Sequence, residues 1–125
     1  MGVNKIIGKA GEDIAANYLA KNGYDVLNRN FSSRIGEIDI VACKDNTICF
    51  IEVKSRRSLK CGFPAESVTH SKQQHIRRTA EYFIMKEGYK IPYFNNMAFR
   101  FDVCNIIFDT EGVSMESMEY IENAF

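Results

Sequence analysis

Residues 34–57, RIGEIDIVACKDNTICFIEVKSRR, decide the fold. Val, Ile, Phe and Cys fill the apolar positions on both sides of a polar break at residues 44–47, and this alternation is typical of a β-hairpin. Asp45 and Asn46 both tolerate the positive φ angles of a two-residue turn, which would place Lys44 opposite Thr47. The turn therefore predicts the register of the two strands.

In this register two acids face each other. Counting inward from the turn, Asp39 lies opposite Glu52, and Glu37 lies opposite Lys54 on the same face, since side chains two apart project the same way. Opposed carboxylates, with Cβ atoms ~4.5–5.5 Å apart, weaken a sheet by roughly 0.2–1 kcal/mol. Mg²⁺, which prefers oxygen ligands, would compensate. The alternative is a solvated face on which Lys54 neutralises one acid, and a slip of one residue would separate the acids.

Length and composition predict one ordinary globular domain, residues 1–125. The chain begins without an apolar signal region and has no apolar stretch long enough to span a bilayer, so a cytoplasmic location is expected. The four cysteines, Cys43, Cys49, Cys61 and Cys104, form no CxxC pair, which favours buried free thiols in a reducing compartment. Two histidines far from acidic partners give no zinc site.

Charge is unevenly distributed along a chain whose formal net charge is zero. Residues 54–78 hold seven basic side chains and one acid, Glu66, whereas residues 109–125 hold five acids and no base. The neutral sum argues against strong unspecific affinity for nucleic acid. The basic segment nevertheless follows the carboxylates directly, where a polyanion would have to lie. An ordinary solvated surface is the alternative.

Two helices are predicted. The first covers residues 7–22 and stops at Gly23. Glu12 lies at the border of its apolar stripe, where it would either favour the helix dipole or add a third oxygen donor to the carboxylate cluster.

The second helix would open with a capping box, Ser71-Lys72-Gln73-Gln74, and end at Gly88. Its apolar stripe is formed by Ile76, Ala80, Phe83 and Ile84. Lys72, in the first turn, is unfavourable for the dipole and would either bind a phosphate or extend into solvent. Gly62 and Pro64 predict an irregular connection before this helix.

Three further strands complete the pattern: residues 24–31, the long strand 98–108 and an edge strand at 113–118. On the long strand Arg100 and Asp102 share a face and would pair with each other. The order helix, three strands, helix, strand, strand predicts an α/β three-layer sandwich with a central mixed sheet.

At this point the motifs resemble a known group. Asp39 followed by Glu52-Val53-Lys54 is similar to the core of the restriction-endonuclease-like PD-(D/E)xK nuclease superfamily, which includes Holliday-junction resolvases. Along the whole chain the sequence resembles the YraN-like family. The matching pieces are GKAGEDIA from Gly8, Gly23-Tyr24, Arg29-Asn30, GEIDI from Gly36, FIEVKSR from Phe50, Lys72, RFDV from Arg100 and the closing IENAF. Ser32 departs from the family, in which a basic residue is expected.

The resemblance implies Mg²⁺- or Mn²⁺-dependent hydrolysis of DNA phosphodiester bonds, for example in branched or repair intermediates. It implies that Asp39, Glu52 and the Val53 carbonyl hold the metal ion, that Lys54 orients water or stabilises phosphate charge, and that Glu12 completes the site. The candidate phosphate contacts are Arg56, Arg57, Lys72 and Arg77. The candidate supporting residues are Glu37, Gln73 and Arg100.

Partners and alternatives follow from the same pattern. The expected partner is nucleic acid, DNA rather than RNA, read by duplex shape because no aromatic platform for stacking bases is evident in the sequence. Related resolvases are dimers, so a homodimer is an open expectation. The alternative functions are a non-catalytic nucleic-acid-binding module or a structural subunit with the same fold.

Overall fold

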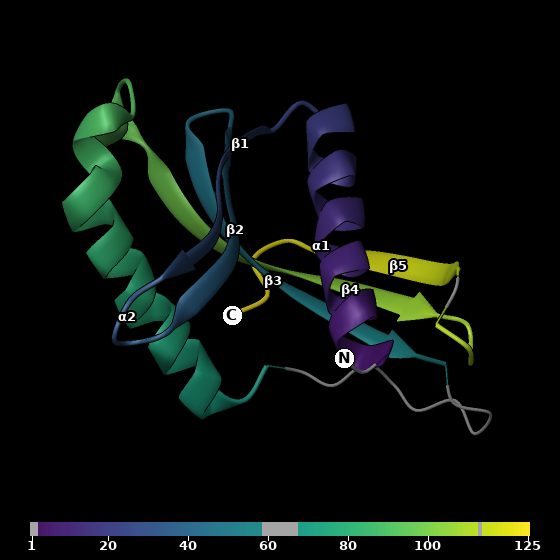
Figure 1. Cartoon of the computed structure of the whole chain (residues 1–125). Coiled ribbons are helices and arrows are strands. Elements are labelled where there is room, and N and C mark those ends of the chain that lie inside the picture. Colours follow the sequence, from purple (N-terminus) through teal and green to yellow (C-terminus); the bar gives the residue numbers. More distant parts are fainter. Residues whose placement is uncertain (1–2, 59–67, 113) are drawn as a thin grey trace.

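The computed structural model describes residues 3–58, 68–112 and 114–125. The order of helices and strands is the predicted one (Figure 1). The elements are α1 (Val3–Lys21), β1 (Asp25–Ser32), β2 (Glu37–Lys44), β3 (Thr47–Arg57), α2 (His70–Glu87), the 3-10 turns η1 (Gly88–Lys90) and η2 (Phe94–Asn96), β4 (Ala98–Phe108) and β5 (Met115–Ile121). The predicted irregular connection at Gly62 and Pro64, the thiol of Cys61 and the start of the predicted last strand at Val113 lie outside the described residues.

The predicted hairpin is confirmed. Asp45 and Asn46 have φ angles of 50° and 62°, as a two-residue turn requires, and Lys44 pairs with Thr47. The antiparallel pairs continue in that register to Ile40 with Ile51. The turn residues alone therefore set which side chains of β2 and β3 share a face.

The five strands form one mixed sheet in the order β1-β2-β3-β4-β5. All neighbours are antiparallel except β3 and β4, which run parallel because α2 carries the chain back across the sheet. α1 and α2 cover opposite faces of this sheet (Figure 1). The predicted three-layer α/β architecture is confirmed.

Each face of the sheet has its own apolar core. On one face α1 contributes Ile7, Ala15 and Leu19, which pack with Ile51 and Ile106 of the sheet. On the other face Ile76, Ala80 and Phe83 of α2 pack with Phe50 and Val103. The alternation of the strands feeds both cores, because neighbouring side chains on a strand point to opposite faces.

The start of α2 differs from the prediction. The N-cap is Thr69, whose hydroxyl oxygen accepts from the Lys72 backbone N–H at 3.2 Å, so the capping box at Ser71 is wrong. Thr69 is an equally good cap and follows the buried Val68, which fixes the entry of the chain. The Gln73 side chain donates to the Val68 carbonyl at 2.9 Å rather than back to a cap.

The two predicted helix ends have different causes. Gly23 has a φ of +86°, so it ends α1 in the left-handed conformation that glycine favours. Gly88 has a φ of −57°, and an added Cβ there would lie 3.1 Å from the Phe94 ring. Gly88 is thus required for close packing after α2 and not for its backbone angle.

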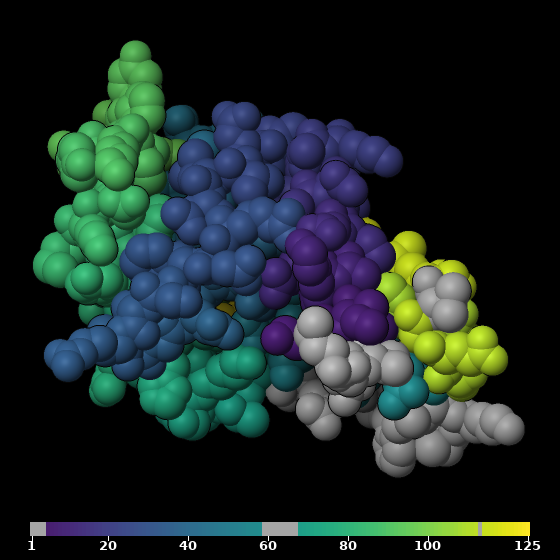
Figure 2. Space-filling model, in the orientation of Figure 1, coloured from purple at the N-terminus to yellow at the C-terminus, as the bar shows by residue number. Residues whose placement is uncertain are grey.

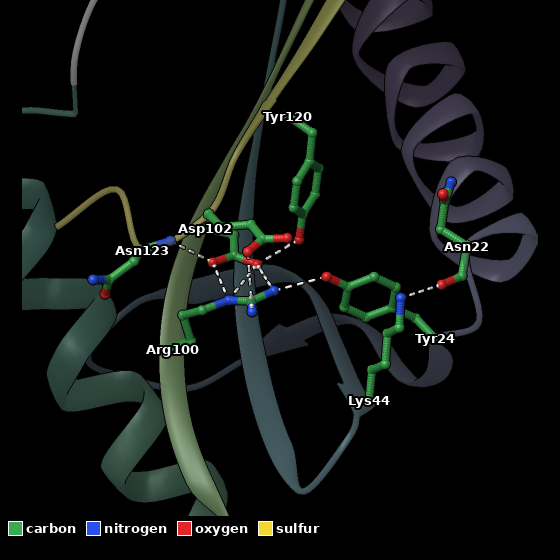
Figure 3. A network of polar contacts seen from close by, with 8 residues as sticks. Asn22, Tyr24, Lys44, Arg100, Asp102, Tyr120 and Asn123 are labelled. Atoms are coloured by element: carbon green, nitrogen blue, oxygen red, sulfur yellow. Dashed lines mark hydrogen bonds and ion pairs between the residues drawn. The ribbon is translucent and has the colours of Figure 1, made fainter.

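The predicted pair of Arg100 with Asp102 is confirmed and belongs to a larger polar network (Figure 3). The Asp102 carboxylate is fully buried and accepts from the Arg100 guanidinium, from the Tyr120 hydroxyl at 2.6 Å and from the Asn123 N–H at 2.9 Å. Arg100 also donates to the Tyr24 hydroxyl at 2.7 Å. The network ties the end of the chain to β4 and to Tyr24, the residue directly before β1.

The thiols that the structure describes are free. Cys49 and Cys104 are buried and Cys43 is half-buried. In the described part of the chain, no helix is both long and apolar enough to cross a membrane.

Candidate functional site

Asp39 lies at the end of β2 where its pairing with β3 stops. The paired residues of the two strands end at Ile40 and Ile51, and one position further the Asp39 side chain accepts from the Val53 backbone N–H at 2.8 Å. The carboxylate thus takes the place of a main-chain acceptor and is held against β3. Its position follows from the hairpin register that the turn sets.

Glu52 is the buried member of the acidic pair. Only 6% of it is exposed, and it lies on β3 one residue beyond the last pair, Ile40 with Ile51, as Asp39 does on β2. One Glu52 carboxylate oxygen lies 2.5 Å from the Lys72 ammonium nitrogen, which comes from the first turn of α2. A buried carboxylate needs such a partner, because desolvation penalises the charged form.

The electrostatics of the pair appear in the pKa of Asp39, which is raised to about 8. Burial is the main cause and the negative charge of Glu52 is the second, while the hydrogen bond from Val53 works in the opposite direction. Lys72 has a raised pKa, chiefly because its ammonium group donates to Glu52. In the absence of a metal ion the pair therefore holds less than two full negative charges at neutral pH.

A cavity of about 460 Å³ opens beside the acids. It lies between the hairpin and the start of α2, and its walls include Asp39, Glu52, Val53 and Lys72. Gly36 permits this approach, since an added Cβ would lie 3.2 Å from the Thr79 hydroxyl oxygen and 3.8 Å from the His75 Cβ. The close packing of the turn before β2 on α2 brings the carboxylates and Lys72 together.

The acidic pair fits a hard divalent cation. Both acids offer oxygen ligands, and their negative charges repel each other. The Lys72 ammonium occupies the position beside Glu52 that a metal ion would take. Within the described ranges no three His, Cys, Asp or Glu side chains form a complete metal-binding group. A metal ion here would need further oxygen ligands from water, backbone or substrate, which is the usual arrangement for Mg²⁺.

Glu12 and Lys54 approach the site from different elements. Glu12 is half-buried on α1, and its charge contributes to the raised pKa of Asp39. Gly11 allows α1 to lie close to β3, because an added Cβ would overlap the Ser55 side chain. Lys54 follows Glu52 by two residues and so projects to the same face, beside Asn105 of β4, but it is not among the described residues that line the cavity.

The other predicted residues have varied surroundings. Glu37 lines the cavity and pairs with Ser32 of β1, while the described pairing of β2 with β3 does not extend to Lys54. Arg57 is exposed, and one buried guanidinium nitrogen of Arg56 has no hydrogen-bond partner among the residues that the structure describes. The Arg77 guanidinium lies 4.6 Å from the centroid of the Phe101 ring. These assignments stay predictions.

Among the residues that line the cavity, three with polar side chains were not predicted as site residues: Thr69, Ser71 and His75. Thr69, the N-cap of α2, precedes Lys72 by three residues, and His75 follows Lys72 by three. Residues three apart are neighbours on a helix, so this spacing could have predicted that both lie near Lys72. Arg100, a predicted supporting residue, contacts Asp102 and Tyr24 in the polar network (Figure 3).

Comparison with known proteins gives a consistent result. Residues 11–106 match the family described as "Uncharacterised protein family UPF0102". A "UPF0102 protein" of Caldicellulosiruptor saccharolyticus is 43% identical over 95% of this chain and 96% of its own length. The corresponding proteins of Clostridium botulinum and Clostridium kluyveri are 46% and 47% identical, over 98% of this chain and 95% of their own lengths.

Proposed function

Since the chain belongs to UPF0102, the YraN family of PD-(D/E)xK nuclease-like proteins, we propose that it hydrolyses phosphodiester bonds of DNA with the help of Mg²⁺ or Mn²⁺. The observation that carries this proposal is the arrangement of Asp39 and Glu52, which share one cavity with the Lys72 ammonium. A protein that only binds nucleic acid has no need to bring a half-buried carboxylate next to a buried one.

The roles of the residues follow from their positions. Asp39 and Glu52 would hold the ion, with the Val53 carbonyl as a further ligand. When bound, such an ion polarises a phosphoryl oxygen and lowers the pKa of a bound water. Lys54 would orient that water or stabilise charge on the phosphate, and Glu12 would complete the acidic group.

Lys72 would change partner during the reaction. If Glu52 held a divalent cation, the Lys72 ammonium would no longer be needed as its partner and would be free to contact a phosphate oxygen. The N-terminal end of α2 adds its partial positive charge at the same place. Arg56, Arg57 and Arg77 would hold neighbouring phosphates, which positions the polymer without reading its sequence.

A nuclease panel tests the proposal. Linear, flapped, forked and four-way substrates of DNA, with RNA counterparts, are incubated with Mg²⁺, Mn²⁺ or chelator. We expect metal-dependent cleavage of at least one DNA substrate, lost in Asp39→Asn and Glu52→Gln. Cleavage that persists in both variants would show that another site or a contaminant is responsible. The homodimer implied by the resemblance stays a prediction, which sedimentation in solution checks.

One observation favours a second candidate function. Lys72 neutralises Glu52 at 2.5 Å, and this contact is also what a structural subunit with an ion-paired remnant of a metal site would show. Calorimetric titration with Mn²⁺ separates the two candidates, because an ion-paired remnant gives no saturable binding.

A further inference from the structure

A second hollow lies at the opposite end of α2 from the carboxylates. Its volume is about 530 Å³, and Tyr89, Tyr93, Phe94 and Asn95 contribute to its walls. Tyr89 and Tyr93 are 81% and 83% exposed. Single exposed apolar residues are common, but two aromatic rings left in water around one hollow indicate a surface for a ligand. Figure 2 shows this light green region projecting from the body of the molecule.

The aromatic hollow is built on a packed base. Phe94 packs closely on Gly88, and its ring centroid lies 6.0 Å from that of Phe99. Tyr93 has a φ of 59°, a left-handed conformation that is unfavourable for a bulky residue. The fold therefore holds the Tyr93 backbone in an unfavourable conformation, although the Tyr93 ring is exposed and gains little from burial.

A stripe of side chains connects the hollow with the carboxylate cavity. We call it the α2 stripe: Lys72, His75, Arg78, Tyr82, Lys86 and Tyr89. The intervals of three or four residues place the first five, from Lys72 to Lys86, on one side of α2, and Tyr89 follows in the 3-10 turn η1. Lys72 and His75 line the carboxylate cavity, and Tyr89 lines the aromatic hollow.

The α2 stripe combines basic side chains with two tyrosine rings, and none of its six members is an acid. The Lys86 ammonium lies 5.8 Å from the centroid of the Tyr82 ring, which packs on Phe31 of β1. Glu81 follows Arg78 by three residues, so this acid borders the stripe at one position. From Lys72 to Lys86 the helix rises about 21 Å, the length of roughly six nucleotides stacked at about 3.4 Å each.

From these observations we propose that the α2 stripe and the aromatic hollow bind a single-stranded segment of nucleic acid. Phosphates would lie on Lys72, Arg78 and Lys86, and unpaired bases would stack on the rings of Tyr89 and Tyr93. A duplex cannot use these rings, because its base faces are covered by neighbouring bases. The inference rests on the proposed function and narrows its substrate to DNA that carries a single-stranded arm.

Binding without metal tests this inference separately from catalysis. Fluorescence anisotropy of labelled eight-nucleotide single strands and of a duplex is measured in chelator. Base stacking on one aromatic side chain gives roughly 5- to 100-fold in affinity, so Tyr89→Ala with Tyr93→Ala should weaken single-strand binding at least 10-fold. Tyr89→Phe with Tyr93→Phe should retain it, and Lys21→Ala, an exposed lysine outside the stripe, is the matched control.

Three outcomes would overturn the inference: a loss below 2-fold in the alanine variant, equal losses in the alanine and phenylalanine variants, or equal affinity for duplex and single strand. Circular dichroism checks that the variants fold, and Tyr89→Leu alone replaces the double variant if that unfolds. Single-strand binding that depends on the tyrosines, without cleavage of any substrate, would contradict the proposed nuclease and leave this inference standing. Metal-dependent cleavage, together with single-strand binding that does not change in the tyrosine variants, would support the proposed nuclease and contradict this inference.

Discussion

Replacing Asp39 by asparagine should stabilise the metal-free protein at alkaline pH. Asparagine has the same shape and its oxygen can still accept from the Val53 N–H, but it carries no charge beside Glu52. In the folded wild type the pKa of Asp39 is raised from its ordinary 3.8 to about 8 by burial and by Glu52. Asp39→Asn removes the cost of ionising a buried acid next to another acid.

The sign follows from proton linkage. The folded state keeps the Asp39 proton up to about pH 8, whereas the unfolded chain releases it near 3.8. The contribution of this proton to stability is thus complete below the unfolded pKa and is lost as the pH rises through the folded pKa. The difference between the two pKa values corresponds to about 6 kcal/mol, at about 1.4 kcal/mol per pH unit. Relaxation of the side chains around the charge reduces this value, so we expect Asp39→Asn to raise the free energy of unfolding at alkaline pH by about 2–5 kcal/mol.

Urea unfolding in chelator, followed by circular dichroism between pH 5 and pH 9, measures the effect. The free energy of unfolding of Asp39→Asn should exceed that of wild type increasingly from pH 5 to pH 8, and Mg²⁺ should reduce the difference. Glu116→Gln, an exposed acid on β5, is the control and should follow wild type. Parallel curves for wild type and Asp39→Asn would refute the reasoning, because Asp39 would then ionise as it does in an unfolded chain.

Other perturbations separate metal binding, chemistry and folding. Glu52→Gln should weaken Mn²⁺ binding at least 10-fold and leave Lys72 without its partner, which calorimetry and the midpoint of thermal unfolding report; unchanged binding would remove Glu52 from the site. Lys54→Ala should lower the cleavage rate at saturating metal far more than it lowers metal affinity, and equal losses would contradict its assigned role. Asp102→Asn should cost on the order of 3 kcal/mol in urea unfolding, since it breaks a buried charge pair, yet leave Mn²⁺ affinity unchanged; altered affinity would show that the polar network reaches the site.

The sequence predicted the parts of the site that depend on local rules. The hairpin register follows from two turn residues that tolerate positive φ, so Asp39 and Glu52 could be placed opposite each other without coordinates. Arg100 and Asp102 could be paired because they share a face of one strand.

Contacts between elements that are distant in the sequence could not be predicted from local patterns. The ion pair between Lys72 and Glu52 depends on how α2 lies against the sheet, which no local pattern specifies, and Lys72 was left between solvent and phosphate. Thr69 and Ser71 were comparable caps by composition, and the packing of Val68 decided between them. The aromatic hollow was missed because Tyr89 and Tyr93 lie in short turns without periodicity.

The most direct test of the central claim is a crystal structure of the protein grown with Mn²⁺, with anomalous scattering recorded to locate the metal. We predict one strong anomalous peak within about 2.5 Å of carboxylate oxygens from both Asp39 and Glu52, with the Lys72 ammonium displaced from Glu52. A map without a peak at this place, with Lys72 still paired to Glu52, would contradict the account.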